Sequence, residues 1–302
     1  MTVAHERVAA PASVEGGRFS AGWLGERLSG LALHVAVIGL TVAWIVPTAG
    51  LLVSSFRPLA AISTTGWWRA LTPPFSFTLD NYQHVLATSN LSTSFFNSFM
   101  ITIPATVIPT TLAAFAAYAF TQMRFPGRNL LFLFLVGLLA VPLQVTFIPL
   151  LTLFHTLQLN GTFLGIWLAH TGYGLPFSIY LLANFFRALP GDLFESAEMD
   201  GAGPLTVFFR IVLPLSVPAI ASLVIFQFLW IWNDLLVALI YLGGTPEVAP
   251  MTVTVANLVN SLGGGYEKLT AAAFLSMIVP LVVFFSLQRF FVRGILAGSV
   301  KG

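Results

Sequence analysis

The chain contains no cysteine among its 302 residues, which excludes disulfides, thiolate metal sites and cysteine nucleophiles. Charge is also scarce. Only 8% of the residues are Asp, Glu, Lys or Arg, whereas soluble domains carry about 25%. The net charge of +2 is too small to indicate a nucleic-acid partner.

Motifs for nucleotide binding, metal binding and catalysis are also missing. The only lysines, Lys268 and Lys301, lack the preceding glycine of a phosphate-binding loop. The five histidines show no spacing typical of metal ligands, and no serine lies in a nucleophile motif. We therefore expect a chain that is not an enzyme, with no metal site and no cofactor of its own.

Apolar residues dominate what remains, since 57% of the chain is hydrophobic and the mean hydropathy is +0.89. A membrane-spanning helix needs roughly 20 mostly apolar residues, and six segments provide them. They are residues 31–56, 95–121, 130–154, 163–186, 215–242 and 271–287. The sequence predicts an all-α polytopic membrane protein with six transmembrane helices.

Three regions follow from this pattern. Residues 1–30 are predicted to be a mostly disordered tail, residues 31–287 a six-helix transmembrane domain, and residues 288–302 a second tail. Positively charged loops stay in the cytoplasm, and ten of the 13 Lys and Arg residues fall on the side that holds both tails. Both termini are therefore expected to be cytoplasmic.

Acidic residues are concentrated in one cytoplasmic loop. Four of the eleven, Asp192, Glu195, Glu198 and Asp200, lie within nine positions. Asp192 is expected to cap a short helix, with Glu195 three residues later completing the capping pattern. That helix should run from residue 193 to about residue 200.

A turn and a second helix should follow the acidic helix. Gly201 permits positive φ, and Pro204 suits the first turn of a helix that continues toward Pro214. Residues 190–214 are thus predicted to form a helix-turn-helix on the cytoplasmic face. It could be a solvated loop whose acids only satisfy helix dipoles. However, the anionic leaflet repels acids, which favours a surface for a basic cytoplasmic partner.

The residues of this segment resemble the EAA motif of ABC importer permeases. The match consists of Glu195, Ser196, Ala197, Gly201, Ile211, Leu213 and Pro214 in the motif's spacing, with Asp200, Gly201 and Ala202 as the D-G-A of the carbohydrate branch. Ser196 replaces an alanine, which is the one departure. The stretches FTLDNYQHVL (77–86), FLWIWND (228–234) and the C-terminal tail also resemble MalG-like sugar permeases, and ISTTGWW (62–68) resembles α-glucoside permeases.

The resemblance implies a permease in the inner membrane of a prokaryote. It would pair with a homologous second permease, receive a carbohydrate from an external solute-binding protein, and dock on a cytoplasmic ABC ATPase dimer that holds ATP and Mg²⁺. Glu195 to Ala202 would form the coupling helix. The tail would enter between the ATPases, unless it is an ordinary frayed terminus, through Arg293, Gly294, Gly298, Lys301 and Gly302. The cargo would be an oligosaccharide such as an α-glucoside, maltose or trehalose.

Polar residues inside the spans are candidates for the substrate pathway. Asp234 is the single intramembrane acid, and an intramembrane carboxylate needs a cavity or a hydrogen-bond partner. The other candidates are Asn97, Gln144, Gln227, Trp230 and Asn233. Packing against neighbouring helices or lipid is the competing interpretation. An ion-coupled secondary transporter of a small polar solute is the alternative function, although no internal repeat supports it.

Overall fold

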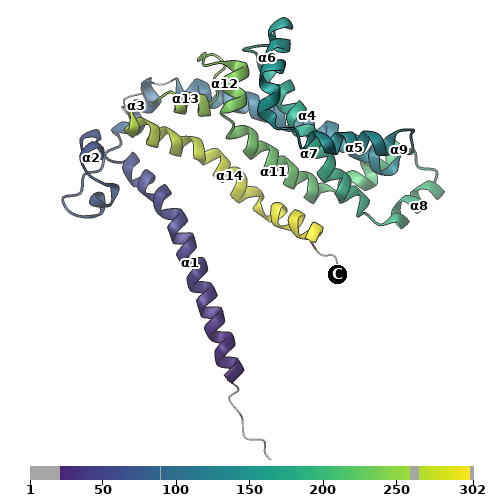
Figure 1. The fold of residues 1–302 in the computed structure, drawn as a ribbon, viewed down its shortest axis with the longest axis horizontal. Helices are drawn as coiled ribbons and strands as arrows, with labels where there is room; N and C mark the ends of the chain where they lie inside the picture. The colour runs from purple at the N-terminus through teal and green to yellow at the C-terminus, as the bar shows by residue number, and fades with distance from the viewer. Residues whose placement is uncertain (1–20, 89, 259–264, 300–302) are drawn as a thin grey trace, which may run out of the picture. The chain divides into compact units, whose positions relative to one another are not determined.

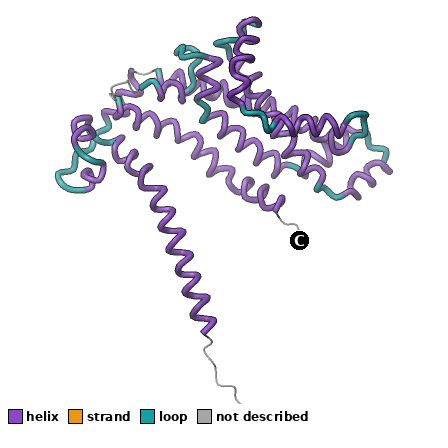
Figure 2. The backbone as a smooth tube through the Cα atoms, in the orientation of Figure 1, coloured by secondary structure: helices purple, strands orange, loops and turns teal. Residues whose placement is uncertain are grey.

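The computed structural model describes residues 21–88, 90–258 and 265–299. Figure 2 shows helices joined by loops and turns, and the described residues include no strand. The all-α prediction is therefore confirmed. The chain divides into two compact units, residues 1–51 and residues 52–302.

The first unit holds most of the long helix α1 (Ala21–Ser55). This helix begins ten residues before the expected span, inside the segment predicted to be a tail. Its large apolar side chains are exposed from Leu31 to Val46. A helix that is apolar on all faces suits a lipid environment or the core of a larger assembly.

In the second unit, the segment before the central helices is held by buried polar side chains. It contains α2 (Leu59–Thr64), a 3₁₀-helix (Trp67–Leu71) and α3 (Asp80–Thr88). The Arg57 guanidinium is buried and donates to the carbonyl of Ala61 at 2.8 Å. The Asn81 amide donates to the carbonyls of Ser55 and Arg57 at 2.8 and 2.9 Å.

Helix α4 (Leu91–Gln122) packs on α7 (Phe163–Arg187) and on α11 (Val217–Trp232), and α14 (Tyr266–Ser299) packs on α11 (Figure 1). Hydroxyl residues are buried at every fourth position of one α4 face, a spacing that keeps them on one side of the helix. They are Ser94, Ser98, Thr102, Thr106 and Thr110. Small side chains of this kind let membrane helices approach closely.

The expectation of one continuous span over residues 130–154 is wrong. The structure has α5 (Arg128–Leu138), a 3₁₀-turn (Leu143–Thr146) and α6 (Phe147–Thr156), with a bend of 97° between the two halves. Pro142 has no N–H to donate and disfavours α geometry at Val141. Hydropathy alone does not show this break.

The continuous span expected over residues 215–242 is also wrong. Helix α11 ends at Trp232, and α12 (Leu236–Leu242) begins after a short break, followed by α13 (Met251–Ala256). Helix α11 is itself bent by 73° from the preceding helical segment Pro204–Leu215. Asp234 lies in the break between α11 and α12.

Three helical segments among the described residues are long and apolar enough to cross a membrane: Gly30–Ser55, Leu91–Gln122 and Tyr266–Gln288. The number rises to five if each of the two bent pairs counts as one span. Helix α7 coincides with the expected span over residues 163–186 but is not among these segments. Several apolar helices are therefore present, and the count of six stays a prediction.

Candidate functional site

The acidic helix is α8 (Gly191–Met199), and it starts earlier than expected. Pro190 occupies the N-cap position and no side chain caps the helix, so the capping box of Asp192 and Glu195 is wrong. Pro190 and Gly191 bring the chain into helical geometry before Asp192, which lies in the first turn. There its carboxylate still complements the positive end of the helix dipole. The Ser196 hydroxyl donates to the Asp192 carbonyl at 2.8 Å.

The turn at Gly201 closes α8 as a Schellman motif. The N–H of Ala202 donates to the Ala197 carbonyl at 2.9 Å, and the N–H of Gly201 donates to the Glu198 carbonyl at 3.0 Å. Gly201 has φ of +71°, a conformation in which a side chain is strained. The predicted positive-φ turn is confirmed, and it satisfies the last carbonyls of α8 without any side chain.

The second limb begins at Pro204, as predicted. It runs through α9 (Pro204–Val207), a π-helical turn (Phe208–Val212) and α10 (Leu213–Leu215). Pro214 accounts for the widened turn, because it lacks an N–H and its ring crowds the carbonyl four residues earlier, that of Arg210. Instead, Leu213 donates to the Phe208 carbonyl five residues earlier. Such π-turns are frequent at functional sites.

The inner face of this segment belongs to the main hydrophobic core. Ala197, Val207, Phe208 and Val212 are buried in one cluster with side chains of α4, α7 and α11. Ile211 and Leu213 are partly buried against the same cluster. The Phe208 ring lies 4.7 Å from that of Phe115, centroid to centroid. Residues 190–214 are thus a packed part of the helix bundle.

Tyr118 connects the end of α4 to the elbow, which is the turn of residues 200–204 between α8 and α9. Its hydroxyl donates to the Pro204 carbonyl at 2.9 Å, and its ring centroid lies 5.3 Å from that of Phe208. This contact spans 86 residues of sequence, and our sequence analysis missed it. The only signal was a single hydroxyl on an otherwise apolar stretch of helix.

The outer face of α8 is exposed and mixes charge with apolar surface. The Asp192, Glu195, Glu198 and Asp200 side chains are all exposed. In the part of the chain that the structure describes, none of them forms an ion pair. The Met199 side chain between them is 90% exposed. This arrangement suits contact with a basic partner that also covers apolar surface.

Asp234 uses its carboxylate inside the chain. The N–H groups of Val237 and Ala238 donate to it at 3.3 and 2.9 Å, so it satisfies the first turn of α12. The buried His170 ring lies 3.9 Å away, measured from Nε2 to Oδ2. The Thr252 hydroxyl donates to the Asp234 carbonyl at 2.6 Å. Asp234 therefore acts as the helix cap that a broken membrane helix requires.

Two other pathway candidates are buried and hydrogen-bonded within the chain. The Gln227 amide donates to the Ser178 hydroxyl at 2.9 Å and ties α11 to α7. The Asn97 amide donates to the carbonyls of Glu247 and Ala249 at 3.0 and 3.1 Å and ties α4 to the loop after α12. Both side chains are at most 6% exposed.

The remaining pathway candidates are more accessible. Gln144 lies in the bend between α5 and α6, and its side chain is exposed. Asn233 is exposed at the break after α11, where its amide donates to the Leu229 carbonyl at 2.7 Å. Trp230 is half-buried, edge-on to His170 with ring centroids 5.7 Å apart. Gln144 therefore lies on a different element from Trp230 and Asn233, which are at the end of α11.

The tail residues proposed to meet the ATPases fall into two groups. Arg293, Gly294 and Gly298 lie on the last turns of α14. Lys301 and Gly302 lie outside the described residues. As for metals, the described residues contain no group of three or more His, Asp or Glu side chains arranged to hold an ion.

Comparison with known proteins supports one family. Residues 109–297 match the model of the binding-protein-dependent transport system inner membrane component. The osmoprotective compounds uptake permease protein GgtD of Synechocystis sp. is 57% identical over 90% of this chain and 92% of that relative. The alpha-glucoside transport system permease protein AglG of Rhizobium meliloti is 53% identical over 78% of this chain and 63% of that relative.

A third relative, the trehalose transport system permease protein SugB of Mycobacterium tuberculosis, is 35% identical over 76% of this chain and 84% of its own length. The fold matches a crystal structure of a bacterial ABC transporter involved in the import of alginate. The TM-score is 0.75 and the identity 21%, over 91% of this chain and 99% of that one. The chain therefore belongs to the inner membrane components of binding-protein-dependent transport systems, the ABC importer permeases.

Proposed function

We propose that this permease imports an oligosaccharide or related glycoside, with α-glucosides, maltose and trehalose as the first candidates. Two relatives that support this have names that specify an alpha-glucoside and trehalose. The name of the relative at 57% identity specifies osmoprotective compounds instead. A small polyhydroxylated glycoside would be consistent with all three names.

The single observation that carries the mechanism is the two-sided character of residues 190–214. The outer face carries four exposed carboxylates, and the inner face is packed into the core of α4, α7 and α11. A partner that moves α8 would therefore move the three helices behind it as a rigid group. We assign that partner as a cytoplasmic ABC ATPase dimer, which would bind ATP and Mg²⁺, with Glu195 facing one of its basic residues.

Two further partners complete the proposal. A homologous second permease would cover part of the exposed apolar surface of the helices and contribute the other half of the pathway. An external solute-binding protein would deliver the cargo, and a second structural neighbour supports this. That structure, matched at a TM-score of 0.59, contains an alginate pentasaccharide-bound periplasmic protein. Both termini would then be cytoplasmic in a prokaryotic inner membrane.

Within this chain, the accessible polar candidates are preferred as substrate contacts. Asn233 and Gln144 have exposed side chains, and Trp230 offers an indole face to a sugar ring. Gln227, Asn97 and Asp234 remain candidates, but their polar atoms already form hydrogen bonds within the chain. For the C-terminal tail, contact with the ATPases would involve Arg293, Gly294, Gly298, Lys301 and Gly302.

Proteoliposomes test the transport mode. The permease pair would be reconstituted with the ATPase and supplied with the binding protein and radiolabelled trehalose or maltose. We expect uptake that requires ATP, stops with vanadate and survives collapse of ion gradients. Uptake that survives vanadate but stops when the ion gradient collapses would instead establish the alternative, an ion-coupled secondary transporter. Competition by unlabelled α-glucosides against arabinose oligomers would then define the cargo.

A further inference from the structure

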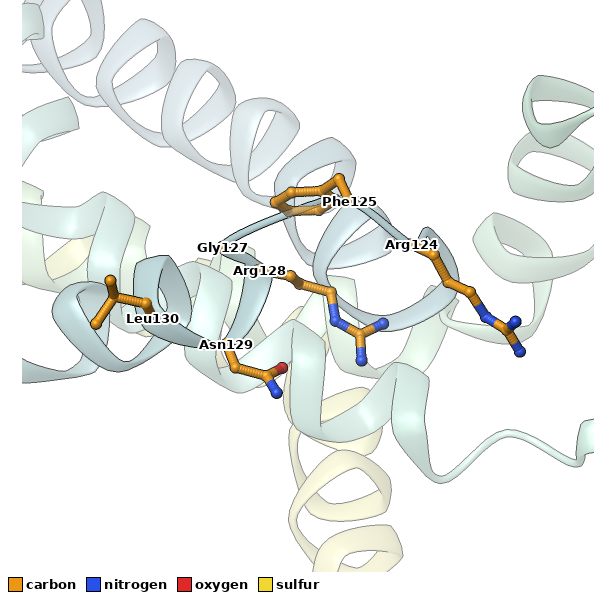
Figure 3. Close-up of a pocket in the computed structure, with 6 residues that line it drawn as sticks. All are labelled: Arg124, Phe125, Gly127, Arg128, Asn129 and Leu130. Atoms are coloured by element: carbon orange, nitrogen blue, oxygen red, sulfur yellow. The ribbon is translucent and has the colours of Figure 1, made fainter.

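A hollow at the turn between α4 and α5 gathers positive charge. It has a volume of about 310 Å³ and is lined by Arg124, Phe125, Gly127, Arg128, Asn129 and Leu130. Figure 3 shows the polar ends of Arg124, Arg128 and Asn129 projecting on the side away from the Phe125 ring. The space is many times what a single water molecule needs, so the hollow is large enough for a small anion.

The arginines of the hollow form no ion pair with the described residues. No acidic residue occurs in the sequence between Asp80 and Asp192. Within the described residues, neither Arg124 nor Arg128 has a carboxylate within 4.0 Å. Arg128 donates one N–H to the Met123 carbonyl at 3.0 Å, which fixes its guanidinium over the turn. Its other N–H groups are available for a bidentate contact with a phosphate.

The backbone adds donors at the same place. Helix α5 starts after Gly127, which has φ of +78° and offers no side chain as a cap. The first N–H groups of an α-helix have no partner within the helix. The backbone hydrogen bonds at this turn are those of Arg128 to Phe125 and Leu131 to Gly127. Within the described part of the chain, the N–H groups of Asn129 and Leu130 therefore remain for a ligand.

The surroundings indicate a ligand with an apolar part. Directly after Asn129, the Leu130 side chain is 72% exposed, and Leu131, Leu133 and Phe134 are exposed as well. Charged and amide groups thus give way within one residue to the apolar surface of α5. This change in polarity is the one found between phospholipid headgroups and acyl chains.

We propose that this hollow binds the phosphate of an anionic phospholipid headgroup, with Arg124 and Arg128 as its ligands and Leu130, Leu131 and Phe134 against the acyl chains. The hydroxyl of Tyr118, near the end of α4, donates a hydrogen bond to the carbonyl of Pro204, within residues 190–214. The proposed headgroup site follows the end of α4, and the same end of α4 contacts the turn after the acidic helix α8. Both therefore lie at the same end of the second unit. A bound lipid would fix the α4–α5 turn, and this inference does not depend on which cargo is transported.

The test measures lipid binding by the full chain, separately from transport. The chain would be purified in detergent and titrated with phosphatidylglycerol or phosphatidylcholine, with bound lipid counted by native mass spectrometry. We expect preferential binding of phosphatidylglycerol. The double variant Arg124→Gln with Arg128→Gln should bind it roughly 30-fold more weakly, because each arginine near an anionic headgroup contributes about one kcal/mol.

Matched variants separate this site from general surface charge. Arg69→Gln with Lys268→Gln removes the same two charges elsewhere and should leave phosphatidylglycerol binding unchanged. Equal loss in both double variants, or unchanged binding in the first, would overturn the proposal. Displacement of the lipid by millimolar inorganic phosphate would mean that the site takes a free anion. If the glutamine pair does not fold, Arg124→Lys with Arg128→Lys keeps the charge and should bind with a smaller headgroup preference.

Discussion

The chain places carboxylates at two helix breaks and uses them in opposite ways. On α8 and at its C-terminal end, the four carboxylates of Asp192, Glu195, Glu198 and Asp200 are exposed, and within the described residues none is in an ion pair. Between α11 and α12, Asp234 turns its carboxylate onto the N–H groups of the following helix. Both breaks interrupt a helical segment, yet only the second needs an acid for its own geometry.

The reason for the difference is how each break satisfies its backbone. Gly201 and Ala202 close α8 with two backbone hydrogen bonds, so no side chain is required there. The first turn of α12 has no equivalent arrangement and depends on Asp234. Acids that a fold does not need are available for a partner. The comparison therefore separates acids that are available for a partner, as proposed for α8, from the acid that holds the fold.

The largest effect should follow from reversing one docking charge. Glu195→Lys is expected to abolish uptake and to weaken ATPase association by about 2 to 5 kcal/mol, roughly 30-fold or more, because an interfacial charge would face a like charge. Co-purification of the ATPase and uptake in proteoliposomes measure this. Insertion into the membrane should be unchanged.

Glu247→Lys provides a control for Glu195→Lys. It reverses an exposed charge in the loop after α12, far along the chain from α8, and should leave ATPase association at the wild-type level. Wild-type uptake by Glu195→Lys would contradict the docking role of α8. Equal loss of ATPase association in both variants would also contradict it.

The next largest effect should come from Gly201, in the turn that ends α8. Gly201→Ala forces a side chain into positive φ at a cost of about 1 to 2 kcal/mol and should lower ATPase association and uptake several-fold. Gly201→Asn should be milder, since asparagine tolerates this conformation. Gly203→Ala should be neutral, because Gly203 has φ of −71° and an added Cβ would meet nothing within 4 Å. Equal effects at positions 201 and 203 would exclude the Schellman turn as the cause.

A change at the break between α11 and α12 should lower the stability of the chain and leave ATPase association unchanged. Asp234→Ala removes the cap of α12 and should cost about 1 kcal/mol, within the range of 0.5 to 2 for lost caps. Thermal denaturation in detergent measures this, and Asp234→Ser should recover part of the loss. ATPase association should stay unchanged. A variant that lost the ATPase at normal stability would remove the contrast between the two breaks.

The smallest effect should come from Tyr118, which contacts the turn between α8 and α9. Tyr118→Phe deletes the hydrogen bond to the Pro204 carbonyl while keeping the ring against Phe208. We expect a loss of about 0.5 to 1.5 kcal/mol in stability and a modest fall in uptake per ATP hydrolysed. Measuring ATPase activity and uptake in the same vesicles tests this ratio. An unchanged ratio would show that the core packing alone holds the elbow.

Local sequence signals predicted the elbow well. Gly201 and Pro204 each have one conformational requirement, so their positions fixed the turn and the start of α9. The predicted cap at Asp192 was wrong because Pro190 occupies the N-cap position and the helix already begins at Gly191. The spans over residues 130–154 and 215–242 were predicted from hydropathy alone. Hydropathy does not show that Pro142 lacks an N–H or that Asp234 can cap a new helix, so it missed both breaks.

Contacts between distant parts of the chain could not be predicted from one sequence. The bond of Tyr118 to Pro204 and that of Gln227 to Ser178 each join residues about fifty to ninety positions apart. Nothing in the local pattern of either segment identifies its partner. Because these partners could not be identified from the sequence, Gln227 and Asn97 were predicted as pathway residues, although their amides form hydrogen bonds to distant parts of the chain. Their role toward a substrate stays a prediction.

The π-helical turn Phe208–Val212 sets the direction in which the acidic helix points. Each residue of an α-helix turns the chain by about 100°. Replacing Pro214 and deleting one residue from this turn, so that it regained ordinary α geometry, would rotate everything before it by that angle about the local axis. The carboxylates of α8 would then face a different neighbour, so the orientation of this surface depends on a single surplus residue.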